Sequence, residues 1–240
     1  MEHTHGRLLD HQQMKRAPGG RLDHQQVGGI AALYLAAAYL ATIPYFLVVL
    51  DYPSVVDPTA KLALLVRHQG SLYTFNILAY VAFGLALTVL ALALHDRLAG
   101  NTPALARVAV GWGLIWSCLL IASGAVGNMG MEYVVRLRLT DATAAAAAWQ
   151  EIESIVNGLG GAGGEALGGP WMLVVGLAGL RSTRLPRALS RLGVVIGMVG
   201  LASNLPPLRE SAAVFGILQI LWFAWLGVVL LRTTHEAEPA

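Results

Sequence analysis

Four long apolar stretches without a charged residue constrain the fold of this chain more than any other feature. They cover residues 27–50, 71–94, 108–127 and 212–231, and none contains Asp, Glu, Lys, Arg or His. A helix rises about 1.5 Å per residue, so about 20 such residues cross the roughly 30 Å hydrocarbon core of a bilayer. A charged side chain in the middle of such a span would cost at least about 2.5 kcal/mol. The four stretches therefore predict membrane-spanning helices.

Two weaker apolar stretches complete the predicted bundle. They cover residues 166–180 and 192–205, and each is short for a span. The linker between them, 181–191, carries four arginines and is typical of a tight cytoplasmic hairpin. We therefore predict an all-α integral membrane bundle of six transmembrane helices. A re-entrant pair is the alternative, because short apolar runs often enter and leave on one side.

The overall composition excludes several classes of protein. Hydrophobic residues make up 56% of the 240 residues and charged residues 12%, whereas soluble domains carry about 25% charged residues. The net charge is +2 and the basic residues are scattered over loops, so we expect no nucleic-acid partner. One cysteine, Cys118, excludes an internal disulfide and an iron–sulfur cluster held by this chain alone. We expect no cofactor and no metal site.

The distribution of lysine and arginine predicts the orientation. With the N-terminus inside, inner segments hold 11 of these residues and outer segments hold 5, which accounts for all 16. The positive-inside rule then places both termini in the cytoplasm. Arginine outnumbers lysine fourteen to two, as in proteins from GC-rich bacterial genomes. We expect a multi-pass protein of the bacterial inner membrane.

The chain divides into two tails and one membrane domain. We interpret residues 1–26 as a disordered polar tail, because the four histidines there have no second cluster of ligands to complete a metal site. Residues 27–232 form the predicted transmembrane domain, and 233–240 form a C-terminal tail.

Two amphipathic helices are expected on the outer surface. Asp57 can cap a helix over residues 59–68 that has Pro58 at its first position. In the long outer segment 130–164, Asp141 can cap an alanine-rich helix that Gly158 ends.

Glu165 is the strongest candidate for a functional side chain. It lies in a glycine-rich segment at the outer mouth of the predicted fourth span. Carboxylates at membrane depth mark ligand or proton sites. The alternative is an acidic residue in the first turn of a helix, where the helix dipole stabilises it.

Other candidates are polar or aromatic groups inside the spans, each with a packing alternative. An amide can line a pocket or form an interhelical hydrogen bond of about 0.6 kcal/mol, and an indole can wall an apolar pocket or fill the core. Small residues spaced by four favour close helix packing, within the bundle or in a homodimer. Besides Glu165, the candidate ligand-binding residues are Asn76, Gln219, Trp171, Trp222 and Asn128, and the candidate packing residues are Gly193, Gly197 and Gly200.

The second half of the chain resembles a known family. Its motifs are Gly-Gly-Glu-Ala-Leu-Gly-Gly-Pro-Trp at 163–171, Leu-Pro-Arg-Ala-Leu at 185–189 with Leu-Gly-Val-Val-Ile-Gly at 192–197, and Phe-Gly-Ile-Leu-Gln-Ile-Leu-Trp-Phe-Ala-Trp-Leu-Gly at 215–227. These resemble bacterial membrane proteins of domain-of-unknown-function family 4386. The resemblance implies a six-helix inner-membrane protein and implies no activity, so it assigns no catalytic residue.

The residues favour a non-catalytic protein that binds a lipid, an apolar small molecule or a membrane partner. No span contains a histidine for a haem, a lysine for a Schiff base or a chain of acids for proton transfer. One alternative is a small transporter with Glu165 near the substrate path. Another is a membrane enzyme that acts on a lipid or isoprenoid at the outer interface, with Glu165 paired to Asp51 or Glu132. A homodimer and a subunit of a membrane complex are both open alternatives.

Overall fold

The computed structural model describes residues 23–160 and 165–232, and every regular element in these ranges is helical. Two elements, η1 and η3, are π-helical, and two short ones, η2 and η4, are 3₁₀-helical. The elements in chain order are α2 (His24–Pro44), η1 (Tyr45–Val49), η2 (Tyr52–Ser54), α3 (Pro58–Arg67), α4 (Gln69–Asn76), η3 (Ile77–Ala82), α5 (Phe83–Leu98), α6 (Pro103–Leu137), α7 (Ala142–Gly160), α8 (Gly168–Leu180), α9 (Arg187–Ala202), η4 (Pro206–Leu208) and α10 (Ser211–Arg232).

Four continuous helical segments are long and apolar enough to cross a membrane. They are His24–Val49, Gln69–Leu98, Pro103–Leu137 and Ser211–Arg232. The prediction of an all-helical fold is therefore confirmed for the described residues, and each of the four predicted spans lies in a helix that is long and apolar enough to cross a bilayer. The helices α8 and α9 contain 13 and 16 residues, about 20 and 24 Å of helix, which is less than the thickness of a bilayer core. The six-span arrangement stays a prediction.

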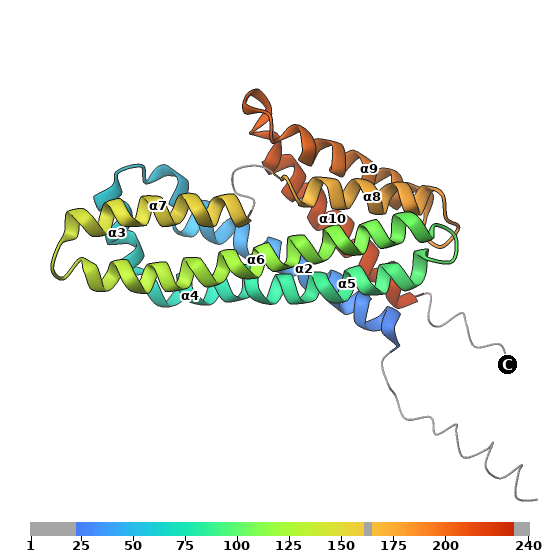
Figure 1. Ribbon diagram of the computed structural model, residues 1–240, viewed down its shortest axis with the longest axis horizontal. Coiled ribbons are helices and arrows are strands. Elements are labelled where there is room, and N and C mark those ends of the chain that lie inside the picture. Colours follow the sequence, from blue (N-terminus) through green and yellow to red (C-terminus); the bar gives the residue numbers. More distant parts are fainter. Residues whose placement is uncertain (1–22, 161–164, 233–240) are drawn as a thin grey trace, which may run out of the picture.

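The molecule is elongated and has two hydrophobic cores (Figure 1). The larger core lies among α2, α5, α8, α9, α10 and the first half of α6, which we call the bundle. The smaller core lies at the other end, where α3, α4 and α7 pack against the last turns of α6, and we call this part the cap. Residues of the cap core are Leu50, Leu62, Leu65, Leu72, Met131, Val134, Ala145, Ala146 and Trp149.

The cap corrects two predicted helix boundaries. The predicted third span ends at Gly127, but α6 continues without a break to Leu137. It continues because Met131 and Val134 extend its apolar face and are buried in the cap core. The predicted stop at Gly158 is also wrong, since α7 reaches Gly160, where the backbone packs so closely on Ser123 and Tyr80 that a methyl group would lie 2.6 Å from the Ser123 hydroxyl.

Both predicted helix caps of the outer segments are present. The Asp57 carboxylate accepts a hydrogen bond from the Ala60 amide at 2.7 Å, and the Asp141 carboxylate accepts one from the Ala144 amide at 2.9 Å. The helix predicted over 59–68 is α3. The first span begins at His24, three residues inside the segment predicted as the 1–26 tail. Residues 1–22 of that tail and the predicted tail 233–240 lie outside the described residues.

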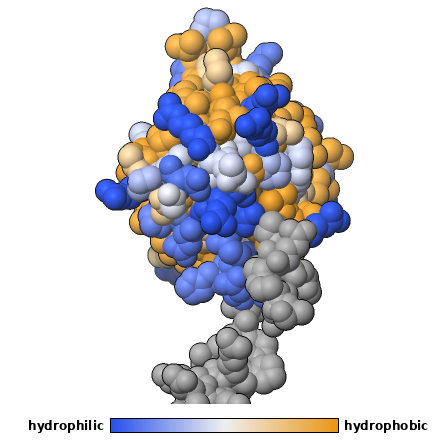
Figure 2. Space-filling model, turned by 90° about the vertical axis from the view of Figure 1, so that its right-hand side faces the viewer, coloured by the Kyte–Doolittle hydropathy of each residue, from blue (hydrophilic) through white to orange (hydrophobic). Residues whose placement is uncertain are grey.

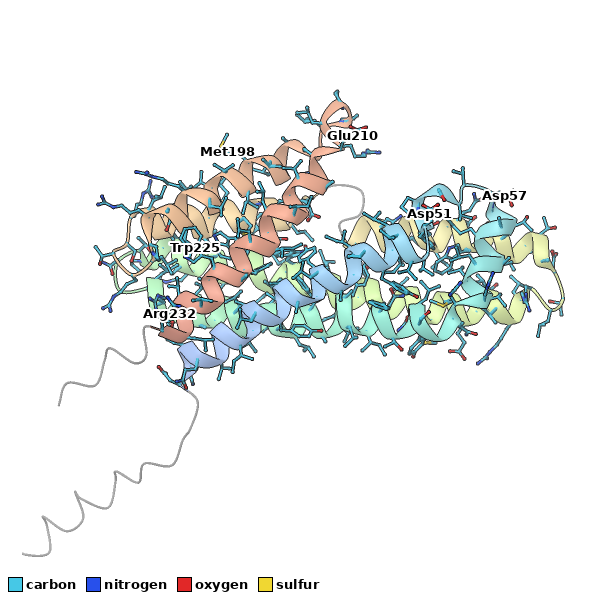
Figure 3. The ribbon with its side chains drawn as sticks, turned by 180° about the vertical axis from the view of Figure 1, so that it is seen from behind. Asp51, Asp57, Met198, Glu210, Trp225 and Arg232 are labelled. Carbon is cyan, nitrogen blue, oxygen red and sulfur yellow. The ribbon has the colours of Figure 1, made fainter. Side chains whose placement is uncertain are left out.

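Charged residues lie at both ends of the molecule, and Glu210 lies between the ends, in the loop before α10 (Figure 3). Asp51 and Asp57 lie at the cap, and Arg232 lies at the opposite end, beside the start of α2 (Figure 3). Viewed from that opposite end, hydrophilic residues fill the middle of the face and hydrophobic residues surround them (Figure 2). Between the ends, large apolar side chains such as Ile30, Leu85 and Leu221 are exposed. An exposed apolar girdle between two polar ends is what a bilayer requires.

Helices α8 and α9 pack closely through glycine. A methyl group at Gly197 would lie 2.5 Å from the backbone nitrogen of Leu173, and one at Gly200 would lie 2.8 Å from the Cα of Gly169. Gly193 faces the Trp222 indole nitrogen and the Cα of Gly176. No side chain lies between the two backbones at these points, so the helices cannot separate without losing their contacts.

The Gly197→Ala variant should unfold at a lower temperature in detergent than the unaltered protein. The added methyl group meets backbone atoms, which cannot move aside, and overpacking of this kind costs about 1–3 kcal/mol. Gly111→Ala is the matched control, because no atom lies within 4 Å of the position a methyl group would take there, and alanine favours a helix by about 1 kcal/mol over glycine. Equal melting temperatures of the two variants would contradict the packing assigned to Gly197.

Candidate functional site

A cavity of about 400 Å³ lies where α2, η1, η3 and α10 surround the segment that leads into α8. Leu120 of α6 lines the cavity and lies about 25 Å along that helix from its first residue, Pro103, at the end of the molecule that carries Arg232. The cavity is therefore close to the boundary between bundle and cap. It is lined by Ala38, Tyr39, Thr42, Ile43, Phe46, Leu47, Ala79, Tyr80, Phe83, Leu120, Gly160, Glu165, Ala212, Ala213, Gly216 and Ile217.

Glu165 is the one charged residue of the cavity wall, and the backbone around it is fixed. Its amide N–H donates to the hydroxyl of Ser203 at 3.0 Å, and its carbonyl accepts from the Gly169 amide at 3.0 Å. Ser203 is fully buried and donates in turn to the Gly200 carbonyl at 2.7 Å. A methyl group at Gly168 would lie 3.1 Å from a carboxyl oxygen of Glu165, so the absence of a side chain at Gly168 leaves room for the carboxyl group.

The surroundings of Glu165 disfavour its charged form. No Lys, Arg or His of the described chain forms an ion pair with it. Glu165 belongs to the connection before α8 and not to a spanning helix, and burial raises the pKa of its carboxyl group to about 8. A cation placed beside this carboxyl group would favour its charged form.

Two phenols are the polar neighbours of this acid. Tyr39 of α2 and Tyr80 of η3 both interact electrostatically with Glu165. The ring of Tyr39 meets the edge of the Phe83 ring at a centroid distance of 5.2 Å. Apart from these groups and Thr42, the wall is apolar. The cavity is therefore mainly apolar, with a polar corner formed by Glu165, Tyr39 and Tyr80, as is usual for a small-molecule site.

Both π-helical segments form parts of the cavity wall. In η1, which follows Pro44, the Leu50 amide donates to the Tyr45 carbonyl at 2.9 Å. In η3, the Leu78 carbonyl accepts the Tyr34 hydroxyl at 2.7 Å. A π-helical turn carries an extra residue and is frequent at functional sites. Here the two turns contribute Phe46 and Leu47 on one side and Ala79 and Tyr80 on the other.

The predicted amides Asn76 and Asn128 lie together but apart from Glu165. The Asn76 amide donates to the Asn128 side-chain oxygen at 3.0 Å, and the Asn128 amide donates to the Tyr73 carbonyl at 3.3 Å. They therefore tie α4 to α6. Asn76 lines a second, smaller cavity of about 70 Å³ under the cap, which shares only Phe46 and Tyr80 with the first.

Gln219, Trp171 and Trp222 lie in the bundle core and do not line the main cavity. The Trp222 indole donates to the Leu189 carbonyl at 3.0 Å. The indole nitrogen of Trp171 and both polar atoms of the Gln219 amide are buried without a hydrogen-bond partner. A hydrogen-bonding group left unmet in this way costs about 1–3 kcal/mol.

The carboxylates proposed for an enzyme do not converge. Asp51 is exposed in a left-handed conformation with φ 46°, and Glu132 forms an ion pair with Arg136 one turn along α6. Neither residue lines the cavity that holds Glu165. An acid–base pair at the outer interface therefore has no geometric support.

The sequence interpretation missed the cavity residues Tyr39, Thr42 and Tyr80. A signal for the first two was present, because Thr42 and Phe46 follow Tyr39 by three and seven residues, and this spacing predicts one shared face of the first span. It also missed the polar cluster in the cap. There the Lys61 ammonium pairs with Glu153 at 3.2 Å and lies 4.5 Å above the Tyr52 ring, and burial raises the pKa of the Tyr52 phenol.

The Gln219→Met variant should be at least as stable as the unaltered protein. Methionine has a similar length and removes a buried amide that has no partner, a gain of about 1 kcal/mol. Ser203→Ala is the contrasting variant, since it removes a hydroxyl that is fully bonded, and its melting temperature in detergent should fall. If the melting temperature of Gln219→Met fell as far as that of Ser203→Ala, the Gln219 amide would have a hydrogen-bond partner in the protein in solution.

Stability should also depend on pH through Glu165. The unfolded chain ionises near the ordinary glutamate pKa of 4.5, whereas the folded protein keeps the proton up to about pH 8. Between these values the folded state binds more protons, so its stability falls as pH rises. Melting temperatures measured from pH 5 to pH 8 should decline less in Glu165→Gln than in Glu132→Gln, which alters an exposed carboxylate. Parallel declines would refute the assignment.

Comparison with known proteins places the chain in a family without a known activity. Residues 30–232 match the family described as Domain of unknown function (DUF4386), as the resemblance in the second half of the sequence indicated. No curated protein and no solved structure matches the chain. Because the match covers well over half of the 240 residues, the chain belongs to the DUF4386 family.

Proposed function

We propose that this protein is a non-catalytic membrane protein that binds a lipid or an apolar small molecule in the cavity at Glu165. The observation that carries the proposal is the cavity itself, about 400 Å³ with a mainly apolar wall and a single, partly buried acid among its described residues. Ligand sites in proteins have volumes of about 300–1,000 Å³, apolar linings and a few placed polar groups.

The packing of α2 against α10 explains why an opening exists on this side. Near the polar end the helices touch, since a methyl group at Gly29 would lie 3.1 Å from the Gly227 carbonyl oxygen. At the cavity they have diverged, because a methyl group at Gly216 would meet only the tip of Ile43, at 3.9 Å. The helices therefore form a wedge that is closed at one end and open at the other.

The ligand enters this wedge from the bilayer. Leu47 and Ile217 belong to the cavity wall, and they are also 54% and 62% exposed on the apolar girdle. A lipid chain or an apolar molecule dissolved in the membrane would reach the cavity between these side chains without crossing water.

The same proposal includes the membrane topology. Both ends of the described chain lie at one end of the molecule, as an even number of spans requires (Figure 1). The hairpin 181–191, with its four arginines, lies at that end as well. We place this end in the cytoplasm of a bacterial cell, with α8 and α9 as the two short spans. The cavity then lies near the outer boundary of the inner membrane.

Binding fits this site better than transport or catalysis. A transported molecule would have to continue toward the polar end, where the rings of Trp171, Trp222 and Phe223 pack at centroid distances of 5.5–6.3 Å. A reaction would need a second reactive group near Glu165, and the described wall offers only phenols and a threonine.

The Gly216→Leu variant should lose ligand binding, because its side chain would fill the cavity without a backbone clash. The probe is 1-dodecanol with a photoreactive diazirine in its chain, cross-linked to the full-length protein in detergent and measured by intact-protein mass spectrometry. We expect at least a tenfold lower yield of adduct than for the unaltered protein.

Gly111→Leu is the control for this experiment. It adds the same side chain at a position of α6 that is open on all sides, so its adduct yield should match that of the unaltered protein. Equal yields for Gly216→Leu and Gly111→Leu, or no saturable labelling of any protein, would overturn the proposed function.

A further inference from the structure

We propose that the ligand is an amphiphilic organic cation, an alkyl amine or a quaternary ammonium compound, whose head group pairs with Glu165. This inference rests on the proposed function and names the chemical class of its ligand. The first observation behind it is the missing counter-charge. The partly buried acid has no cationic partner in the described chain, and none of its described neighbours in the wall is basic.

The carboxyl group is placed where a ligand can reach it. The connection that carries it is anchored from behind by the Ser203 and Gly169 hydrogen bonds, so the backbone does not take part in ligand binding. The carboxyl group forms no hydrogen bond or ion pair with another described residue, and it borders the cavity. Its acceptor capacity is therefore free for a ligand, and a cation would use it more fully than a neutral group.

Aromatic rings around the acid match the same head group. Tyr39 and Tyr80, which interact electrostatically with Glu165, line the cavity together with Phe83 and with Phe46 of η1. The face of such a ring attracts a cation, with an energy of up to about 2 kcal/mol when water is excluded. Tyrosine rings beside a carboxylate are the usual elements of sites for ammonium groups.

The rest of the cavity accepts a chain and not a second charge. From the polar corner the wall continues through Ile43, Leu47 and Ile217, which are apolar and lead to the lipid-facing opening. A cation without an apolar chain would leave this part empty, and a chain without a cationic head would leave the acid unpaired. The wall therefore fits a molecule that has both parts.

The pH dependence of binding should follow the carboxyl group of Glu165, and two other titratable groups face it. They are Tyr39 on α2 and Tyr80 on η3, and the part of α10 that lines the cavity carries no titratable group. A quaternary ammonium head keeps its charge at every pH. Its binding should therefore strengthen as pH rises through the range in which Glu165 loses its proton.

The test compares two probes that differ only in the head group. Each is a dodecyl chain with the same diazirine, ending in trimethylammonium in one probe and in hydroxyl in the other. Competition curves against unlabelled probe give the affinity of the full-length protein, Glu165→Gln, Glu165→Asp and Gly111→Leu in one detergent at pH 6, 7 and 8.5. Differences in micelle partitioning cancel when proteins are compared with the same probe.

At pH 8.5 we expect Glu165→Gln to bind the ammonium probe at least tenfold more weakly than the unaltered protein and Gly111→Leu do, and to bind the alcohol probe less than threefold more weakly. Glu165→Gln should also remove the rise in affinity for the ammonium probe between pH 6 and 8.5. Glu165→Asp, which keeps the charge, should retain part of both. This rescue separates loss of charge from loss of structure.

Two results would overturn the inference and remain distinguishable. If Glu165→Gln leaves the affinity for both probes unchanged, or weakens both to the same degree, the ligand class is wrong while the cavity still functions as an apolar site. If neither probe shows saturable labelling in the unaltered protein, the proposed function itself fails.

Discussion

The close approach of helix backbones through glycine is the interaction on which the rest of this structure depends. Lipid is as apolar as the side chains it contacts, so burial of apolar surface does not drive helices together inside a bilayer. Contact between backbones does, and glycine permits it at Gly29 against Gly227 and at Gly197 against Leu173. The bundle is therefore tight where glycines meet, and α2 separates from α10 where Gly216 has no close neighbour.

The position of Glu165 follows from the same contacts. Packing of α8 on α9 brings Ser203, at the end of α9, next to the connection that precedes α8. The Ser203 hydroxyl then accepts the Glu165 amide, and Gly168 leaves space for the carboxyl group. The α8–α9 interface therefore holds the backbone of this acid, and the carboxyl group beside it is partly buried.

Much of the fold could be predicted from the sequence. One signal in it reflects what a bilayer requires of a spanning segment, and the other reflects what the start of a helix requires. The absence of charge over about 20 residues identifies a span, and Asp57 and Asp141 supply acceptors for free amides at helix starts. The continuation of α6 to Leu137 was not predicted, because Glu132 and Arg136 suggest the end of a membrane segment. They face outward while Met131 and Val134 continue the buried stripe.

The candidate site was predicted only in part for a related reason. Glu165 stands out in the sequence because it is an acid among glycines. Tyr39 and Tyr80 do not, because tyrosine is common in spanning helices and the two residues meet only through tertiary packing of α2 against η3. Gln219 and Asn76 are as polar as a binding residue would be, yet they lie in the core and under the cap. Polarity within a span reveals the kind of group but not the direction in which it points.

The cap and the cavity are connected through the two π-helical turns. Each of η1 and η3 lies between a bundle helix and the cap, and each adds one residue to its turn. Phe46 and Tyr80, which these turns carry, line both the main cavity and the small one under the cap. A regular α-helix over the same residues would rotate every later side chain by about 100°, because one residue is 1/3.6 of a turn. Packing in the cap therefore positions the rings of Phe46 and Tyr80 in the wall of the main cavity, although the cap lies outside the bundle.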